Sequence, residues 1–297
     1  MSDGLYIEET GEGAPLVLLH GWAMHGGVFA LLAERLRARH RLYIVDLPGH
    51  GRSRDSAVPL QPEACAAAIA ARVPRAPWCG WSLGGLVALH AAATRPDAVP
   101  ALAMLCASPR FVRGDGWRFG MSPEVFQDFA RGLREDYRGT LDRFIALEAF
   151  GSDDARGELR TLRAEVFARG EPAARVLADG LELLETADLR GELPALAVPS
   201  LWIAGRRDRL VDPRAMRAAA ELARESEHAV VEHGGHAPFL THADEVAALL
   251  AGFVDRVGEA GAAAARSTAE AETETPGAPS LREDDEGQRG GGVGEPT

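Results

Sequence analysis

Two amino acids are missing from this chain of 297 residues, which has no lysine and no asparagine. The codons for both are AT-rich, so their absence indicates a GC-rich genome and not a functional adaptation. Cysteine is also scarce, and its three copies (Cys65, Cys79 and Cys106) are scattered and odd in number. That distribution excludes a disulfide framework and lacks metal-site spacing. Because Cys79 and Cys106 lie in apolar runs, we expect buried thiols, a reducing cytoplasm and no metal or organic cofactor.

Long apolar runs and excess positive charge are absent as well. No run approaches the roughly 20 residues that span a membrane, and residues 1–4 lack the basic and apolar stretches of a secretory signal. The net charge of −12 argues against a nucleic-acid surface. We therefore expect a cytoplasmic protein that binds neither a membrane nor nucleic acid.

Negative charge is concentrated at the C-terminal end of the chain. Residues 258–297 hold nine acidic residues and three arginines, so they supply −6 of the net −12. Their composition of mainly Ala, Gly, Glu, Thr and Pro offers too little apolar surface to offset chain entropy. It predicts a disordered acidic tail over 258–297.

What the chain does contain is a series of continuous apolar runs separated by helical patterns. Such runs are typical of strands covered on both faces, and helices between them predict an α/β protein with a mostly parallel, doubly wound sheet. The runs that predict strands are residues 15–19, 41–45, 76–79, 101–106, 200–204 and 228–232.

The alternation stops over residues 111–187, where no run predicts a strand. Amphipathic patterns there predict helices over 123–134, 141–150, 155–168 and 172–184. A helical insertion of this size is typical of a lid over an active site. We expect a core formed by residues 1–110 and 188–257, a helical lid at 111–187, and the tail at 258–297.

A serine lies where one predicted strand meets the next helix, in residues 80–84 (GWSLG). So sharp a turn forces Ser82 into a strained conformation that projects its hydroxyl above the helix N-terminus. Glycines two residues either side are needed, because a Cβ would clash where strand and helix pack. Ser82 is therefore the candidate nucleophile, and the alternative is an ordinary helix N-cap.

A serine nucleophile needs a base, and the base needs an acid that orients it. His236 follows the last predicted strand in a loop of small residues, and Asp208 lies just past the preceding strand. The chain order Ser82, Asp208, His236 is the one expected of the α/β-hydrolase architecture. His233 is the rival base, whereas Asp212, before a proline, is more typical of a helix cap.

Acyl transfer also needs donors for the negative charge that develops on the substrate oxygen. The backbone N–H of Leu83, directly after the candidate nucleophile, is the first candidate. The second is expected in the loop after the first apolar run, where the Trp22 N–H is best placed and its indole would line the pocket. Plain packing is the alternative role for Trp22. In the loop after the second run, Asp46 and His50 are interpreted as structural turn residues.

Four motifs together resemble the α/β-hydrolase superfamily over about residues 12–257, namely residues 20–22 (HGW), 46–51 (DLPGHG), 80–85 (GWSLGG) and 236–239 (HAPF). Within it the sequence looks closest to the pimeloyl-[acyl-carrier protein] methyl ester esterases of biotin synthesis. The motifs for that family are Gly21-Trp22, Trp81, residues 143–148 (RFIALE) and residues 180–190 (GLELLETADLR).

The resemblance implies a carboxylesterase that frees a pimeloyl chain on acyl carrier protein from its methyl ester. It implies Ser82, Asp208 and His236 as the catalytic residues and the Trp22 and Leu83 amides as the oxyanion hole. The implied acyl channel is lined by Phe144, Ile145, Ala146, Leu147 and Glu148. The arginines implied to hold the acidic carrier protein are Arg138, Arg143, Arg156 and Arg160, and Arg163 continues the helix face of the last two. Gly139 departs from this pattern, which expects another basic residue there.

Other functions stay open on the sequence. They are a broad-specificity short-chain carboxylesterase, another reaction of the same fold such as lactone or carbon–carbon bond hydrolysis, and a non-catalytic ligand-binding member of the fold. A serine at position 82 disfavours dehalogenase and epoxide hydrolase chemistry, which needs a carboxylate nucleophile. The presence of all three triad residues disfavours the hypothesis of a non-catalytic protein.

Overall fold

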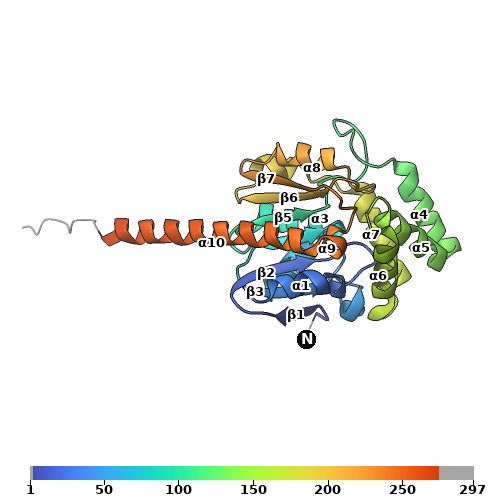
Figure 1. Cartoon of the computed structure of the whole chain (residues 1–297), viewed down its shortest axis with the longest axis horizontal. Helices are drawn as coiled ribbons and strands as arrows, with labels where there is room; N and C mark the ends of the chain where they lie inside the picture. Colours follow the sequence, from blue (N-terminus) through green and yellow to red (C-terminus); the bar gives the residue numbers. More distant parts are fainter. Residues whose placement is uncertain (1–2, 274–297) are drawn as a thin grey trace, which may run out of the picture. The chain divides into compact units, whose positions relative to one another are not determined.

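A seven-stranded β-sheet forms the centre of the protein in the computed structural model, which describes residues 3–273 (Figure 1). β1 pairs antiparallel with β3, and every other neighbouring pair in the sheet is parallel. β2 to β7 match the six predicted runs, so the prediction of a mostly parallel sheet is confirmed. The strand order is β1 (Tyr6–Thr10), β3 (His40–Asp46), β2 (Ala14–Leu19), β4 (Trp78–Trp81), β5 (Leu102–Leu105), β6 (Ser200–Gly205) and β7 (Ser226–Val231).

β1 is the strand that the apolar runs do not indicate. Its sequence, YIEET, lies at one edge of the sheet with every residue half-buried or exposed. Because an edge strand of this kind is not covered on both faces, it has no continuous apolar run by which it could be identified.

Helices cover both faces of the sheet, as expected for an α/β protein. α3 (Leu83–Thr94) packs against β4 and β5 and contacts α2 (Pro62–Ala70). α1 (Ala30–Leu36) lies in front of the sheet in Figure 1, whereas α3 lies behind it. The shorter elements are η1 (Gly26–Phe29), η2 (Gly51–Ser53), η3 (Arg190–Ala195), α8 (Pro213–Ala220) and α9 (Pro238–Thr241).

Residues 111–187 form a helical insertion between β5 and β6, and its helices lie together at one side of the sheet (Figure 1). Each of its four helices overlaps a predicted helical pattern, with differences at the ends. The helices are α4 (Pro123–Glu135), α5 (Tyr137–Ala149), α6 (Ala155–Ala168) and α7 (Ala174–Thr186).

α10 (Ala243–Thr273) departs from the predicted start of disorder at residue 258. The alanine-rich sequence of residues 260–265 (AGAAAA) explains the difference, since alanine has the highest intrinsic helix propensity. The compact unit that contains the sheet extends to Glu259, within α10. The rest of the predicted tail, residues 274–297, lies outside the described residues. Across residues 3–273, no helix is both long and apolar enough to cross a membrane.

Candidate active site

Ser82 stands between β4 and α3 in a conformation that few residues adopt. Its φ of 52° and ψ of −119° lie outside the helical and extended regions. The chain can turn this sharply because a Cβ on Gly80 would collide with the Gly84 carbonyl, and a Cβ on Gly84 would lie 2.5 Å from the Leu19 carbonyl oxygen. Ser82 precedes α3, but its side chain makes no capping hydrogen bond. Its hydroxyl is therefore not used as a helix cap.

Asp208 and His236 form a buried hydrogen-bonded pair. His236 Nδ1 lies 2.8 Å from Asp208 Oδ2, and the two residues are 1% and 6% exposed. The other carboxylate oxygen of Asp208 accepts hydrogen bonds from the Leu210 and Val211 backbone N–H groups at 2.8 and 2.9 Å. These bonds fix the carboxylate, so its free oxygen orients the imidazole.

The loop that carries His236 is held against the turn at Ser82. The Trp81 indole N–H donates to the His236 carbonyl oxygen at 2.8 Å, and the two rings lie 5.6 Å apart. Phe239 packs on the same indole at 5.0 Å. His236 Nε2 is buried and has no hydrogen-bond partner in the described structure. This nitrogen is consequently available to accept a proton.

The loop after β2 approaches Ser82 closely. A Cβ on Gly21 would lie 3.1 Å from the Ser82 Cβ, and Ala23 has a strained φ of 64°. The Trp22 backbone N–H makes no hydrogen bond within the described residues. Leu83 is the first residue of α3, where backbone N–H groups lack acceptors inside the helix. Both predicted oxyanion donors thus belong to segments that flank Ser82.

An apolar pocket adjoins Ser82, with a cavity of about 20 Å³. That is room for about one water molecule. Of the five predicted channel residues, only Phe144 lines it. The pocket is completed by Phe111, Met121, Val125, Phe126, Phe129, Leu181, Leu184 and Leu210.

The other predicted channel residues have different environments. Ile145 and Glu148 are fully buried, Leu147 is half-buried and Ala146 is exposed. A helical segment cannot direct five consecutive side chains to one face, because its period is 3.6 residues. The structure therefore does not bring Ala146 to the pocket.

Two carboxyl groups of the helical insertion are buried near Asp208. Glu148 and Glu158 are 0% and 2% exposed, and their oxygens have no hydrogen-bond partner in the described structure. Burial, followed by the negative charges of Glu158 and Asp208, holds the pKa of Glu148 well above its usual value. Burial also raises the pKa of Glu158 to about 7. Glu158 is not among the predicted site residues, since a Glu on an amphipathic helix is normally exposed.

The four arginines predicted to contact a carrier protein are all exposed on the insertion. Arg138 bonds to Glu171 at 3.1 Å, and Arg143 bonds to the Thr140 hydroxyl at 2.6 Å. Arg156 and Arg160, on α6, have no ion-pair or hydrogen-bond partner within residues 3–273. These two guanidinium groups are thus unengaged.

The rival residues occupy other environments. The side chain of His233 is 61% exposed and lies 3.3 Å from Asp153. Asp212 caps α8 by accepting from the Arg214 backbone N–H at 2.8 Å, so its interpretation as a helix cap is confirmed. His50 is buried and lies within hydrogen-bonding distance of the Pro48 carbonyl, at 3.0 Å.

Asp46 joins the core to the helical insertion. It accepts from the Gly26 and Arg52 backbone N–H groups at 2.7 and 2.8 Å, which confirms a structural turn role. It also pairs with Arg169 at 3.1 Å, and Arg169 bonds to Glu8 at 3.0 Å. This role of Arg169 was not predicted, because no local sequence pattern links residues 123 positions apart.

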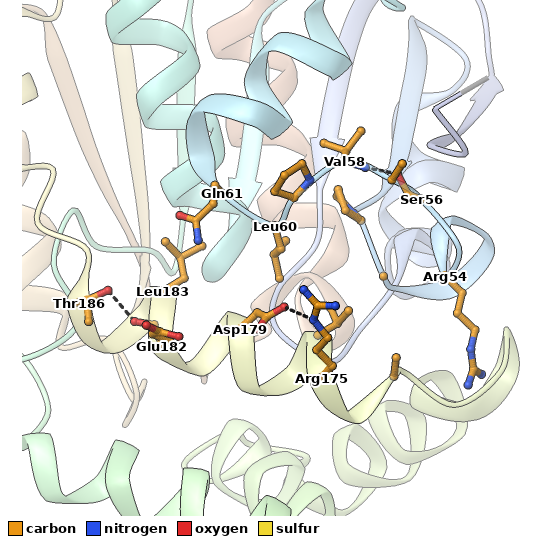
Figure 2. A pocket seen from close by; sticks show the side chains of 16 residues that line it. Arg54, Ser56, Val58, Leu60, Gln61, Arg175, Asp179, Glu182, Leu183 and Thr186 are labelled. Carbon is orange, nitrogen blue, oxygen red and sulfur yellow. Dashed lines mark hydrogen bonds and ion pairs between the residues drawn. The ribbon is translucent and has the colours of Figure 1, made fainter. Parts of the chain in front are cut away.

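A larger cavity of about 700 Å³ lies away from the triad, between the loop after η2 and α7. Figure 2 shows Leu60 and Leu183 on opposite walls, and Arg175 beside Asp179. None of the predicted site residues lines this cavity. In the described part of the chain, no group of three or more His, Cys, Asp or Glu side chains is arranged to hold a metal.

Residues 14–243 match the family model of the alpha/beta hydrolase fold. A Stenotrophomonas maltophilia protein named pimeloyl-[acyl-carrier protein] methyl ester esterase is 59% identical, over 84% of this chain and 96% of that protein. A Xanthomonas campestris protein of the same name is 58% identical, over 84% of this chain and 98% of that protein.

Solved structures show the same fold at lower identity. An esterase from Exiguobacterium antarcticum superposes with a TM-score of 0.75 at 24% identity, covering 84% of this chain and 95% of that one. An enol-lactonase from Burkholderia xenovorans superposes with a TM-score of 0.74 at 23% identity, covering 84% and 96%. At these identities the likeness establishes the architecture alone.

Proposed function

Because this chain belongs to the alpha/beta hydrolase fold family, we propose that it is a serine carboxylesterase acting on the methyl ester of a pimeloyl chain carried by acyl carrier protein. The observation that carries the esterase chemistry is the buried Asp208–His236 pair, hydrogen-bonded at 2.8 Å, together with the strained turn at Ser82. The substrate is supported by the names of relatives that are 58–59% identical to the chain.

In the proposed reaction, His236 Nε2 accepts the Ser82 proton while the serine oxygen attacks the ester carbonyl. The Trp22 and Leu83 amides donate to the oxyanion. His236 returns the proton to the departing methanol, and water then hydrolyses the acyl-enzyme by the same steps. Asp208 accepts from the His236 Nδ1–H, which keeps Nε2 free to act as the base.

The helical insertion, residues 111–187, is assigned as a lid over a core formed by residues 1–110 and 188–257. The cavity of about 20 Å³ beside Ser82 is too small for a seven-carbon acyl chain. Side chains of α4, α5 or α7 therefore move when substrate enters. In this assignment Phe144 contacts the acyl chain, whereas Ile145 and Glu148 are fully buried and do not line the cavity.

Carrier-protein recognition is assigned first to Arg156 and Arg160. Their guanidinium groups are exposed and unengaged, so pairing with an acidic partner breaks no existing ion pair. Arg138 and Arg143 are assigned a smaller part, since each already bonds to a neighbour. The three free, buried cysteines are consistent with a reducing cytoplasm, and the net charge of −12 argues against a nucleic-acid partner.

The test is kcat/KM for pimeloyl-carrier-protein methyl ester against a free short-chain methyl ester, with Ser82→Ala as the inactive control. A strong preference for the carrier-bound ester is expected. Equal or faster turnover of the free ester would contradict the proposed substrate and would indicate a broad-specificity carboxylesterase. Full activity of Ser82→Ala would contradict serine esterase chemistry on either substrate.

A double variant separates carrier recognition from chemistry. Arg156→Ala with Arg160→Ala is expected to raise KM several-fold for the carrier-bound ester and to leave the free ester unchanged. Arg75→Ala with Arg224→Ala is the matched control, because both are exposed arginines outside the insertion. Equal effects of the two double variants would contradict a role for α6 in recognition.

A further inference from the structure

The indole of Trp22 joins the loop after β2 to helix α7 of the insertion. Its Nε1–H donates to the Leu177 carbonyl oxygen at 2.9 Å, and both residues are fully buried. A carbonyl oxygen has two lone pairs, so Leu177 can accept this bond in addition to one within its helix. The bond therefore links two segments that lie 155 residues apart in the sequence.

Gly180 allows α7 to approach this indole. A Cβ at position 180 would lie 2.6 Å from Trp22 Cδ1 and 3.0 Å from Nε1. Glycine inside a helix costs about 1 kcal/mol relative to alanine. Its presence in the middle of α7 is consequently explained by the close contact with Trp22.

A second helix of the insertion contacts the same ring. Phe144, on α5, packs edge-on against Trp22 with the ring centroids 4.5 Å apart. Directly after Trp22, Ala23 has a positive φ, a conformation that persists only where its surroundings hold it. The indole is thus fixed on several sides next to a strained peptide.

We propose that Gly180 and the Leu177 carbonyl are positioning groups that hold the Trp22 backbone N–H in place through its indole. The inference rests on the proposed function, in which that N–H stabilises the oxyanion. Under this proposal, oxyanion stabilisation depends on α7, whereas the geometry of the triad does not. The donor is correctly placed only while α7 is seated on the indole, so the insertion takes part in stabilising the transition state.

Two variants test the proposal in different ways. Gly180→Ala adds a methyl group against the indole, and Trp22→Phe removes the Nε1–H without adding atoms. Each is expected to lower kcat tenfold or more with KM changed less than twofold, because an oxyanion donor acts in the transition state. The affinity for an alkyl boronic acid, which forms a tetrahedral adduct on serine, should fall in parallel.

Matched controls separate positioning from stability. Gly191→Ala adds its methyl group where no described residue lies within 4 Å. Trp78→Phe alters a fully buried indole whose N–H has no hydrogen-bond partner among the described residues. Both are expected to keep kcat, although Trp78→Phe lowers Tm. All proteins are assayed well below their unfolding midpoints.

The proposal is overturned if Gly180→Ala and Trp22→Phe keep the wild-type kcat and boronate affinity. It is also overturned if only KM rises, since that result indicates a pocket wall and not a positioned donor. Ser82→Ala, assayed alongside, distinguishes the two failures. An active Ser82→Ala contradicts the proposed function itself, whereas an inactive one with normal Gly180→Ala and Trp22→Phe contradicts this inference alone.

Discussion

The residues at the strand ends and those of the helical insertion are placed by different means. Ser82, Asp208 and His236 follow β4, β6 and β7, and each is held by its own turn and a few backbone hydrogen bonds. Phe144 and Glu148 reach the site region only because α5 packs against the core and its neighbouring helices. Local turn geometry thus positions the proposed catalytic residues, while tertiary packing determines which side chains line the pocket.

The largest loss of activity is expected from a substitution at Asp208, one member of the strand-end group (Ser82, Asp208 and His236). In Asp208→Asn, an amide N–H faces His236 Nδ1, which shifts the imidazole proton to Nε2 and prevents that nitrogen from acting as a base. We expect kcat to fall about 10⁴-fold with little change in KM. Steady-state kinetics on the free methyl ester measure this.

Asp212→Asn is the matched control, four residues along the chain. Asp212 caps α8 and does not contact His236. Because asparagine is also a good N-cap, this variant should keep both kcat and stability. A comparable loss of activity in Asp212→Asn would indicate that the loop is disturbed generally and that Asp208 has no special role.

An intermediate effect, a loss of stability, is expected from breaking the Arg169–Asp46 ion pair that joins the insertion to the core. Arg169→Gln leaves the fully buried Asp46 without its cationic partner, and an unpaired buried charge is strongly unfavourable. We expect the free energy of unfolding to fall by about 3 kcal/mol. Urea denaturation measures the loss.

Arg163→Gln supplies the comparison for this pair. Arg163 pairs with Asp142 at 2.9 Å, but both side chains are about half exposed. Exposed pairs contribute about 0–1 kcal/mol, so this variant should be nearly neutral. If Arg169→Gln and Arg163→Gln have equal effects, Arg169 does not hold the insertion on the core.

The smallest change is expected in the pH dependence of stability, to which Glu158 contributes. Its pKa is about 7 in the folded protein against an ordinary 4.5. The folded state therefore keeps a proton that the unfolded state has released, and stability falls as pH rises from about 4.5 to 7. The negative charges of Asp208 and Asp154 help to raise the pKa of Glu158, and the raised pKa of Glu148 adds to the same trend.

Glu158→Gln removes this titration. Relative to wild type, the variant should gain stability between pH 5 and pH 8, by no more than about 3 kcal/mol. The amide still has to be buried, so the gain at pH 8 is offset in part. Thermal unfolding at both pH values measures it, and a difference between the proteins that does not change with pH contradicts the account.

Much of the strand-end group could be predicted because its signals are local. Three features can be identified without knowing the fold: the apolar run before Ser82, the glycines that flank it, and the chain order of Asp208 and His236. Two features of the core were less accessible. β1 lacks a continuous apolar run, and the alanine-rich part of α10 resembles a polar tail in composition although alanine favours helix.

The insertion was predictable as helices but not as contacts. Amphipathic periodicity places α4 to α7 within a few residues of their ends, yet it does not say which face meets the core. For that reason Ala146 was expected in the channel and is exposed. Glu158 was not expected to be buried, and Arg169 was not expected to pair with Asp46 of the core. The bonds of Arg169 join it to Asp46 and Glu8, which lie more than 100 positions away in the sequence.

The most direct measurement of the central claim is the site of covalent labelling by a fluorophosphonate, mapped by mass spectrometry of the digested protein. The account predicts a single adduct on Ser82, slowed strongly in His236→Ala and absent in Ser82→Ala, with loss of ester hydrolysis in proportion to labelling. An adduct on another residue, or full hydrolytic activity in protein that carries no label at Ser82 after exhaustive treatment, would contradict it.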